Sequence, residues 1–366
     1  YGELTHGKLY VKNTPIFYSP YLLFPIKTTR QTGFLLPKRI AYSANKLGWD
    51  VSIPFFWAIS KDTDATFYQR YMTERGFQEG VEFRYALSKD SFGTIYGDVL
   101  NDTKKIKETV GKVSRDWQTE HKRWAFYLNH ESRFDPTLYL RADIARVSDN
   151  FYFKDFSSYN YFLANYGGNR PQPYKRVSFM ADESLSFLDS TARLAKNWQN
   201  YSLNTLVKST QDLTVSSNGQ TLQRYPEITL TGIQQPLFGS RINQQFTGVY
   251  DYFYRDQGQK GHLWDVNPVL TLPLGFGDYF QLTPLAGVRG SFWARDDSAG
   301  NGMKRQGDRE IYTMGATMTS EVHRVYDVGG TEVSKIRHGI RPEVSYTFNP
   351  NFRQENLPDY MAAATE

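Results

Sequence analysis

A two-residue alternation of apolar and polar side chains constrains the fold of this chain more than any other feature. In residues 138–144, Leu140 and Ile144 share one face, and Arg141 and Asp143 lie on the opposite face. Successive side chains of a β-strand point to opposite sides, so the pattern predicts antiparallel strands with one apolar face. A sheet that covers a soluble core gives the same alternation, so strand number and loop lengths must separate the two cases.

The alternating segments predict about 15 strands, most of them as long as the roughly 9–11 residues of a tilted membrane-crossing strand. Strands of soluble domains are shorter, about 5–6 residues. The expected strands are 31–40, 46–57, 63–73, 79–88, 91–101, 122–132, 137–147, 176–187, 190–206, 222–233, 240–254, 262–273, 278–293, 310–325 and 335–348.

The connections between these strands alternate in length. Tight turns are expected at 60–62, 88–90, 134–136, 236–239 and 275–278. Long polar loops are expected at 102–121, 148–175, 207–221 and 294–309. Long loops on one side and short turns on the other are typical of outer-membrane β-barrels, whereas a soluble sandwich has no reason to sort its loops in this way.

Composition agrees with a membrane barrel. Aromatic residues make up 16% of the 366 residues, yet the mean hydropathy is −0.57. Such a pairing suits alternating strands with aromatic girdles at both membrane interfaces. Four tryptophans are expected in the girdle on the long-loop side: Trp49, Trp124, Trp264 and Trp293. No apolar run approaches the roughly 18 residues of a spanning helix.

The sequence offers no catalytic or metal-binding pattern. The six histidines lack metal-ligand spacing, and there is no cysteine. Ser43 and Lys46 match an S-x-x-K motif but lie in an expected hairpin loop, where chance explains them better. We therefore expect a non-enzyme without cofactor or metal.

The net charge of +5 suits an anionic partner. The most basic segment, 101–123, has Ile106, Val110, Val113 and Trp117 at helical spacing, so a short amphipathic helix is expected within this loop. The segment lacks the interleaved basic and aromatic residues of a nucleic-acid groove, which argues against a nucleic-acid partner.

A series of motifs resembles the LptD family of lipopolysaccharide-assembly outer-membrane proteins. The opening motif runs from Pro15-Ile-Phe-Tyr-Ser-Pro20 to Pro25-Ile26 and continues in Arg30-Gln-Thr-Gly-Phe-Leu-Leu-Pro37. Further matching motifs follow in family order: Pro54-Phe-Phe-Trp57, Arg75-Gly76, Glu82-Phe-Arg-Tyr85, Arg123-Trp-Ala-Phe-Tyr-Leu-Asn-His130, Val147-Ser-Asp149, Asp155-Phe156 and His338-Gly-Ile-Arg-Pro-Glu-Val-Ser-Tyr346.

The resemblance implies that residues 1–27 are the end of a periplasmic jelly-roll domain with its linker. Residues 28–366 would be the N-terminal part of a transmembrane β-barrel, which has roughly 26 strands in the family. The chain is accordingly expected to be an internal fragment. The implied function is a translocon that inserts lipopolysaccharide into the outer leaflet of the Gram-negative outer membrane. The implied partners are lipopolysaccharide, membrane lipids, the plug lipoprotein LptE in the lumen, and the periplasmic bridge protein LptA bound to the jelly roll.

The resemblance also implies a lateral gate between the first and last barrel strands. Pro37 and Pro54 match prolines that weaken strand pairing beside this exit, and Phe34, Leu35 and Leu36 would form a lipid-facing wall. Proline cannot donate a ladder hydrogen bond, so these residues alternatively bend the wall or end a strand. Two other functions stay open: a porin or nutrient transporter, and a soluble β-sandwich that binds carbohydrate.

Overall fold

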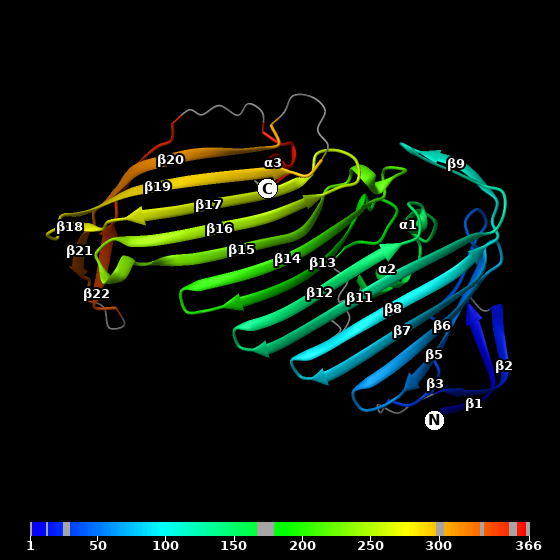
Figure 1. Cartoon of the computed structure of the whole chain (residues 1–366). Helices are drawn as coiled ribbons and strands as arrows, with labels where there is room; N and C mark the ends of the chain where they lie inside the picture. The colour runs from blue at the N-terminus through cyan, green and yellow to red at the C-terminus, as the bar shows by residue number, and fades with distance from the viewer. Residues whose placement is uncertain are drawn as a thin grey trace. The chain divides into compact units, whose positions relative to one another are not determined.

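The computed structural model of the chain is all-β and antiparallel (Figure 1). It describes residues 2–11, 14–24, 30–166, 179–297, 304–329, 333–350 and 357–363. Two compact units are present. The first comprises Tyr1–Arg133, Leu140–Thr191 and Thr210–Asn218, and the second comprises Phe134–Tyr139, Ala192–Ser209 and Gly219–Glu366.

In the first unit, consecutive strands pair antiparallel from β4 to β8, and β8 then pairs with β11. The strands are β3 (Gly33–Phe34), β4 (Arg39–Ser43), β5 (Gly48–Ala58), β6 (Thr63–Met72), β7 (Gly76–Ser88), β8 (Ser91–Asp102), β11 (His121–Asp135) and β12 (Leu138–Val147). Two separate hairpins are β1 (Gly2–Val11) with β2 (Thr14–Phe24), and β9 (Ile106–Val110) with β10 (Val113–Trp117). The helices α1 (Tyr152–Asp155) and α2 (Tyr161–Tyr166) follow β12.

The second unit has the same antiparallel architecture. The strands β13 (Phe187–Asn197) and β14 (Tyr201–Asp212) contribute residues to both units, as do β11 and β12. Its other strands are β15 (Gln223–Pro236), β16 (Asn243–Tyr254), β17 (Gly261–Thr271), β18 (Leu274–Phe276), β19 (Phe280–Arg295), β20 (Gln306–Thr319), β21 (Val322–Asp327), β22 (Lys335–Ile340) and β23 (Glu343–Phe348). The short helices are η1 (Asn218–Gln220, at the unit boundary), η2 (Leu237–Gly239) and α3 (Tyr360–Ala363). Within the described ranges, no helix is long and apolar enough to cross a membrane.

The strands of the first unit bury their polar side chains and expose their apolar ones. On β5, Asp50 and Ser52 are buried, whereas Trp49 and Ile53 are exposed. Along β8, Val99 is 60% exposed, whereas its neighbours Asp98 and Leu100 are buried. Soluble proteins place charged residues outside. A polar inner face with an apolar outer face is the arrangement of a membrane β-barrel.

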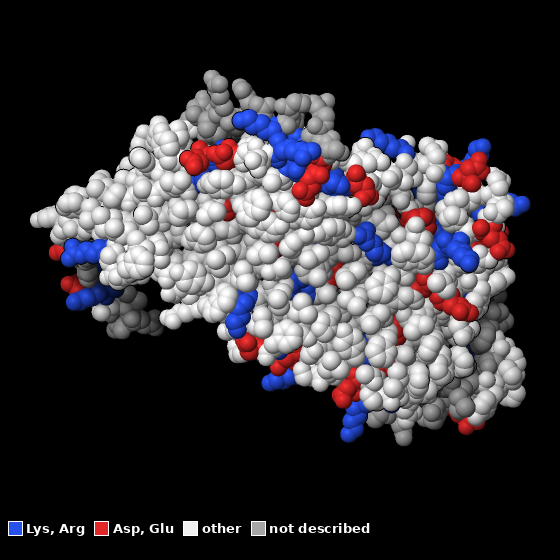
Figure 2. Space-filling view, viewed as in Figure 1, with Lys and Arg blue, Asp and Glu red and all other residues white. Residues whose placement is uncertain are grey.

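The second unit shows the same outward face. Trp264 on β17 and Val288 and Phe292 on β19 are exposed, whereas Ser291 is buried. Figure 2 shows few charged side chains on the visible face of β16, β17 and β19. The expectation that Trp293 belongs to the aromatic girdle is wrong. Trp293 is buried beside Phe253 instead of facing outward, because it shares the inward face with Ser291.

Most expected strands and the alternation of loop lengths are confirmed, and the errors have local causes. The expected strand 176–187 is wrong for the described residues 179–186, which are not in a strand. The strand here is β13, which begins only at Phe187 and ends at Asn197. The expected strand 190–206 is in fact the end of β13 and the start of β14, joined by a turn at 198–200. That turn lacks the glycine or proline that marks most turns in a sequence.

The helix expected within 101–123 is wrong, because the segment forms the β9–β10 hairpin. Ile106 pairs with Trp117, and Val110 pairs with Val113. The helical spacing of these residues is a consequence of their symmetric positions around the turn. Gly111 has a φ of +57°, a left-handed conformation that glycine adopts at little cost.

Candidate functional site

The first strand is interrupted at the expected gate. Phe34 pairs with Phe55, and Arg39 pairs with Ser52, so four residues (35–38) lie opposite two (53–54). This arrangement is a β-bulge, which bends a strand and locally disrupts its ladder. The sequence expectation of one continuous strand at 31–40 is therefore wrong.

Both candidate gate prolines lie at this bulge. The backbone amide of Leu35 donates to the carbonyl of Pro54 at 2.8 Å, and that of Lys38 donates to Ser52 at 3.1 Å. Neither Pro37 nor Pro54 has an N–H to add a further bond. Pro54 is buried, on the face opposite the exposed Ile53. The strands β3 and β4 therefore make few backbone hydrogen bonds to β5 at the bulge that contains the two prolines.

The expected wall residues differ in exposure. Phe34 and Leu36 are 65% and 66% exposed, Pro37 is exposed, and Leu35 is half-buried. Phe34 makes an edge contact with Phe55, with ring centroids 5.1 Å apart. The bulged stretch therefore presents an apolar outer surface. Its role as a lipid-facing gate wall stays a prediction.

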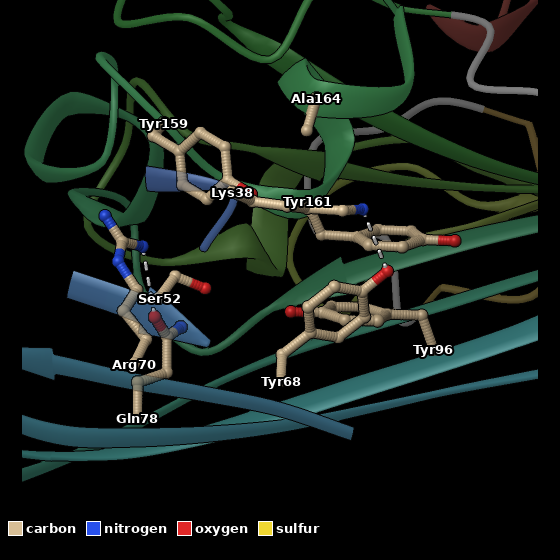
Figure 3. Close-up of a pocket in the computed structure, with 9 residues that line it drawn as sticks. All are labelled: Lys38, Ser52, Tyr68, Arg70, Gln78, Tyr96, Tyr159, Tyr161 and Ala164. Atoms are coloured by element: carbon tan, nitrogen blue, oxygen red, sulfur yellow. Dashed lines mark hydrogen bonds between the residues drawn. The ribbon is translucent and has the colours of Figure 1, made fainter. Parts of the chain in front are cut away.

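Cationic side chains flank the apolar stretch and reach inward to neighbouring strands. On its N-terminal side, Arg30 pairs with Asp64 of β6. On its C-terminal side, Lys38 donates to the hydroxyl of Tyr68 at 3.5 Å, and Arg39 pairs with Asp50 of β5 at 2.5 Å. Figure 3 shows Lys38 above Tyr68, in a cavity of about 30 Å³ that Tyr96 and Tyr161 also line.

A row of inward-facing polar groups continues from Arg39 across the sheet. Asp50 also accepts two hydrogen bonds from Arg70 of β6, at 2.7 and 2.8 Å. Arg70 donates to Gln78 of β7 at 3.1 Å, and the two are drawn bonded in Figure 3. Buried polar groups are costly unless they are hydrogen-bonded, so this row fixes the relative positions of the strands it joins.

Residues 148–166, hereafter the inner loop, pack against the inward face of the first unit. Tyr161 stacks on Tyr96, with ring centroids 3.6 Å apart, and Phe162 makes an edge contact with Tyr127. Tyr152 donates to Asp98 at 2.8 Å. The inner loop thus supplies most of the aromatic side chains of the buried hydrophobic cluster in the first unit.

A buried set of charges holds the inner loop; this ion cluster comprises Arg75, Arg115, Arg123, Asp102, Asp149 and Asp155. Arg123 forms a bidentate pair with Asp149, at 2.9 Å for both bonds, and a further bond to Asp155 at 2.6 Å. Arg75 pairs with Asp102 at 2.5 Å and with Asp155 at 2.9 Å. The three guanidinium groups balance the three carboxylates, and Arg115 also pairs with Glu108 of β9, so the cluster holds structure in place.

Asp155 is the centre of this cluster, because it pairs with all three guanidinium groups. Burial by itself would raise the pKa of its carboxyl. The hydrogen bond from Arg115 and the charges of Arg123 and Arg75 outweigh burial and hold the pKa well below its usual range. Asp155 is therefore ionised at neutral pH, and its contribution to stability is lost only in acid, as the pH falls below the usual carboxyl range.

The sequence contains the members of the ion cluster within separate matching motifs, at Arg75, Arg123, Asp149 and Asp155. Reasoning from the sequence did not bring them together, because they come from a turn (Arg75), a strand (Arg123) and the inner loop (Asp149 and Asp155). Gly76 shows the local constraint: its φ is +103°, and a Cβ there would meet the carbonyl of Asn101 at 3.1 Å. This glycine lets the turn before β7 place Arg75 beside Asp102.

Nothing in this arrangement resembles an enzyme active site. Among the described residues there is no group of three or more His, Cys, Asp or Glu placed to hold a metal ion. The arrangement instead combines a bulged first strand, a polar inner wall and an inner loop fixed to that wall.

Comparison with known proteins identifies a family to which this chain is similar. Residues 121–366 match the family LptD, described as "LPS transport system D". An LPS-assembly protein LptD from Aromatoleum aromaticum is 28% identical over 99% of this chain and 41% of the relative. One from Alkalilimnicola ehrlichii is 27% identical over 98% of this chain and 42% of the relative. Another, from Pseudomonas aeruginosa, is 35% identical over 43% of this chain and 16% of the relative.

This chain spans about two fifths of the length of the first two relatives. A solved bacterial polysaccharide outer-membrane secretin aligns with 88% of this chain and 96% of its own, at a TM-score of 0.26 and 9% identity. That likeness is too low to support any conclusion. The family match covers two thirds of the chain. The chain therefore belongs to the LptD family of Gram-negative outer-membrane β-barrel proteins.

Proposed function

We propose that the protein inserts lipopolysaccharide into the outer leaflet of the outer membrane. The observation that carries this proposal is the match of residues 121–366 to the LptD family. The apolar outer face and polar inner face support it, because they suit a barrel that guides an amphiphile along its wall. In this proposal transport at the protein is passive: lipid delivered by a periplasmic bridge enters through the jelly roll and leaves through a seam in the barrel wall.

The route we propose runs through a lateral gate beside the first strand. Pro37 and Pro54 lie at the bulge that thins the hydrogen bonds between this strand and β5. Phe34, Leu35 and Leu36 supply the apolar surface along which acyl chains pass, and the polar inner wall accommodates the sugar part.

The partners follow from the same proposal. LptE plugs the lumen, and LptA delivers lipopolysaccharide to the periplasmic jelly roll, whose end we assign to residues 1–27. The β1–β2 hairpin supports this assignment, because it pairs with itself and forms a sheet apart from the main one. Residues 28–366 then form the N-terminal part of the transmembrane barrel.

The gate proposal predicts the effect of removing both prolines in the full-length protein. Pro37→Ala together with Pro54→Ala restores two backbone donors and should strengthen pairing at the bulge. Barrel folding and membrane levels should match wild type, whereas surface delivery of lipopolysaccharide should fall. The measurement is the amount of newly made lipopolysaccharide accessible at the surface of intact cells.

Pro284→Ala, at a regularly paired proline of β19, is a control for proline loss as such. If the double variant delivers lipopolysaccharide at the wild-type rate with equal barrel levels, the two prolines are not gate residues. If delivery is unaffected by depleting the protein altogether while small-solute uptake stops, the chain belongs to a porin-like transporter instead.

The proposal also fixes the orientation of the loops. The chain enters from the periplasm, so the connection between β8 and β11 should be extracellular and the β7–β8 turn periplasmic. Lys112→Cys, in the β9–β10 turn, should react with a membrane-impermeant maleimide on intact cells, and Lys89→Cys should react only after the outer membrane is permeabilised. The reverse labelling pattern would contradict the orientation.

A further inference from the structure

The bulge bears on which edge of the first strand can separate from its neighbour. If pairing between the first strand and β5 is thin, the strand can separate on that side as well as at the gate. Two backbone hydrogen bonds, from Leu35 and Lys38, span the bulge. After the bulge, the β4–β5 ladder resumes at Arg39 and Ser52 and runs to Ser43 and Gly48, so an interaction at its first pair would stop separation from spreading beyond the bulge.

Arg39 is placed to supply that interaction. It lies directly after the bulge, and its Nε donates to Asp50 of β5 at 2.5 Å, across the same strand pair that the bulge weakens. The Asp50 carboxylate is buried, and the Arg39 side chain is 19% exposed. A charge-assisted hydrogen bond in such a setting is stronger than an exposed ion pair.

The other end of the Arg39 guanidinium reaches the inner loop. Its Nη1 donates to the carbonyl of Ser158 at 3.4 Å, and its Nη2 donates to the Ser158 hydroxyl at 3.3 Å. The guanidinium also lies over the ring of Tyr159, 5.3 Å from its centroid. One side chain therefore touches the first strand's neighbour and the inner loop at once.

The inner loop gives this contact a fixed anchor. The ion cluster fastens Asp149 and Asp155 to β10, β11 and the turn before β7, and Tyr161 is stacked on the wall. Ser158 and Tyr159 lie between these two attachments, so their positions follow those of the wall.

We propose that Arg39 is a positioning residue that holds the first strand to β5 and to the inner loop, so that the strand opens only at its gate edge. This inference rests on the proposed function and adds to it a residue and a direction of opening. The apolar stretch before Arg39 is then free to move with the lipid, whereas the strand after it stays in place.

The contact can be removed without leaving a buried charge unpaired. In Arg39→Ala, Asp50 keeps both of its bonds to Arg70. The variant should therefore fold, whereas Asp50→Ala or Arg70→Ala would leave a buried partner alone. Ser158→Ala removes only the hydroxyl contact with the inner loop. Arg141→Ala is the matched control, since Arg141 is an exposed arginine of another strand, β12.

The experiment measures hydrogen exchange of the full-length protein in detergent and lipopolysaccharide delivery in cells. In Arg39→Ala, peptides covering 39–43 and 48–53 should exchange at least about tenfold faster, while those of β7 and β8 stay unchanged. Ser158→Ala should give a smaller change at the same peptides, and Arg141→Ala none. Delivery by Arg39→Ala should fall at wild-type barrel levels.

Unchanged exchange in Arg39→Ala would overturn the proposal, and so would faster exchange with unchanged delivery. Faster exchange with reduced delivery supports it. A wild-type protein that delivers no lipopolysaccharide would refute the proposed function, and the exchange comparison would still decide separately whether Arg39 holds the strand.

Discussion

Replacing Arg123 with methionine should lower the free energy of unfolding by about 3–5 kcal/mol and release the inner loop, because it breaks a buried ion pair. The Arg123 side chain is fully buried. Asp149 loses both of its bonds to the guanidinium, and methionine fills a similar volume without replacing the charge. Asp102 and Asp155 each keep a partner in Arg75, so the loss is concentrated at Asp149.

Two measurements on the full-length protein check this expectation. Urea unfolding in detergent gives the free energy, and limited trypsin digestion reports release of the inner loop through cleavage at Lys154. Lys122→Ala is the control, since this neighbouring residue of β11 is exposed. Wild-type stability and wild-type protection of Lys154 in Arg123→Met would show that the ion cluster does not hold the loop.

The second large effect concerns the two faces of β12. Leu140→Arg should place a charge in lipid at a cost of about 2–4 kcal/mol near the midplane, and Arg141→Leu should cost much less. Arg141 shares its face with Asp143 and Ala145, which are buried on the polar inner side. Leu140 shares the opposite face with Ile144.

The comparison is made on the fraction of full-length protein that reaches the folded, heat-modifiable form in the membrane. Leu140→Arg should reduce this fraction strongly, and Arg141→Leu should leave it near wild type. Equal losses in the two variants would mean that the faces of β12 are assigned wrongly.

The faces were predictable from the sequence because strand alternation has a fixed period of two. The expected outward position of the girdle residues Trp49 and Trp124 agrees with their exposure. The girdle expectation failed for Trp293, because parity places it on the inward face with Ser291, where it packs in a buried cluster with Tyr360. A tryptophan near a strand end satisfies either face, so its identity did not decide the side.

The site was only partly predictable. Proline chemistry pointed to Pro37 and Pro54, but the bulge depends on the register of β3 and β4 against β5, which the sequence does not state. The ion cluster joins Arg75, Arg123 and Asp155, separated by tens of residues, through the pairing of strands and the folding of the inner loop. Each of these three residues lies in a motif that matches the family, but the residues next to it in the sequence do not indicate which side chains it pairs with.

The central claim is that lipopolysaccharide passes along the bulged first strand. The most direct test places a photoactivatable amino acid at Leu36 in the full-length protein, in cells that make new lipopolysaccharide. Val288, which is also exposed but lies on β19, serves as the matched position. The account predicts a lipopolysaccharide adduct at position 36 that is several-fold stronger than at 288 and disappears when synthesis stops. Equal adducts at both positions, or an adduct at 36 that persists without synthesis, would contradict it.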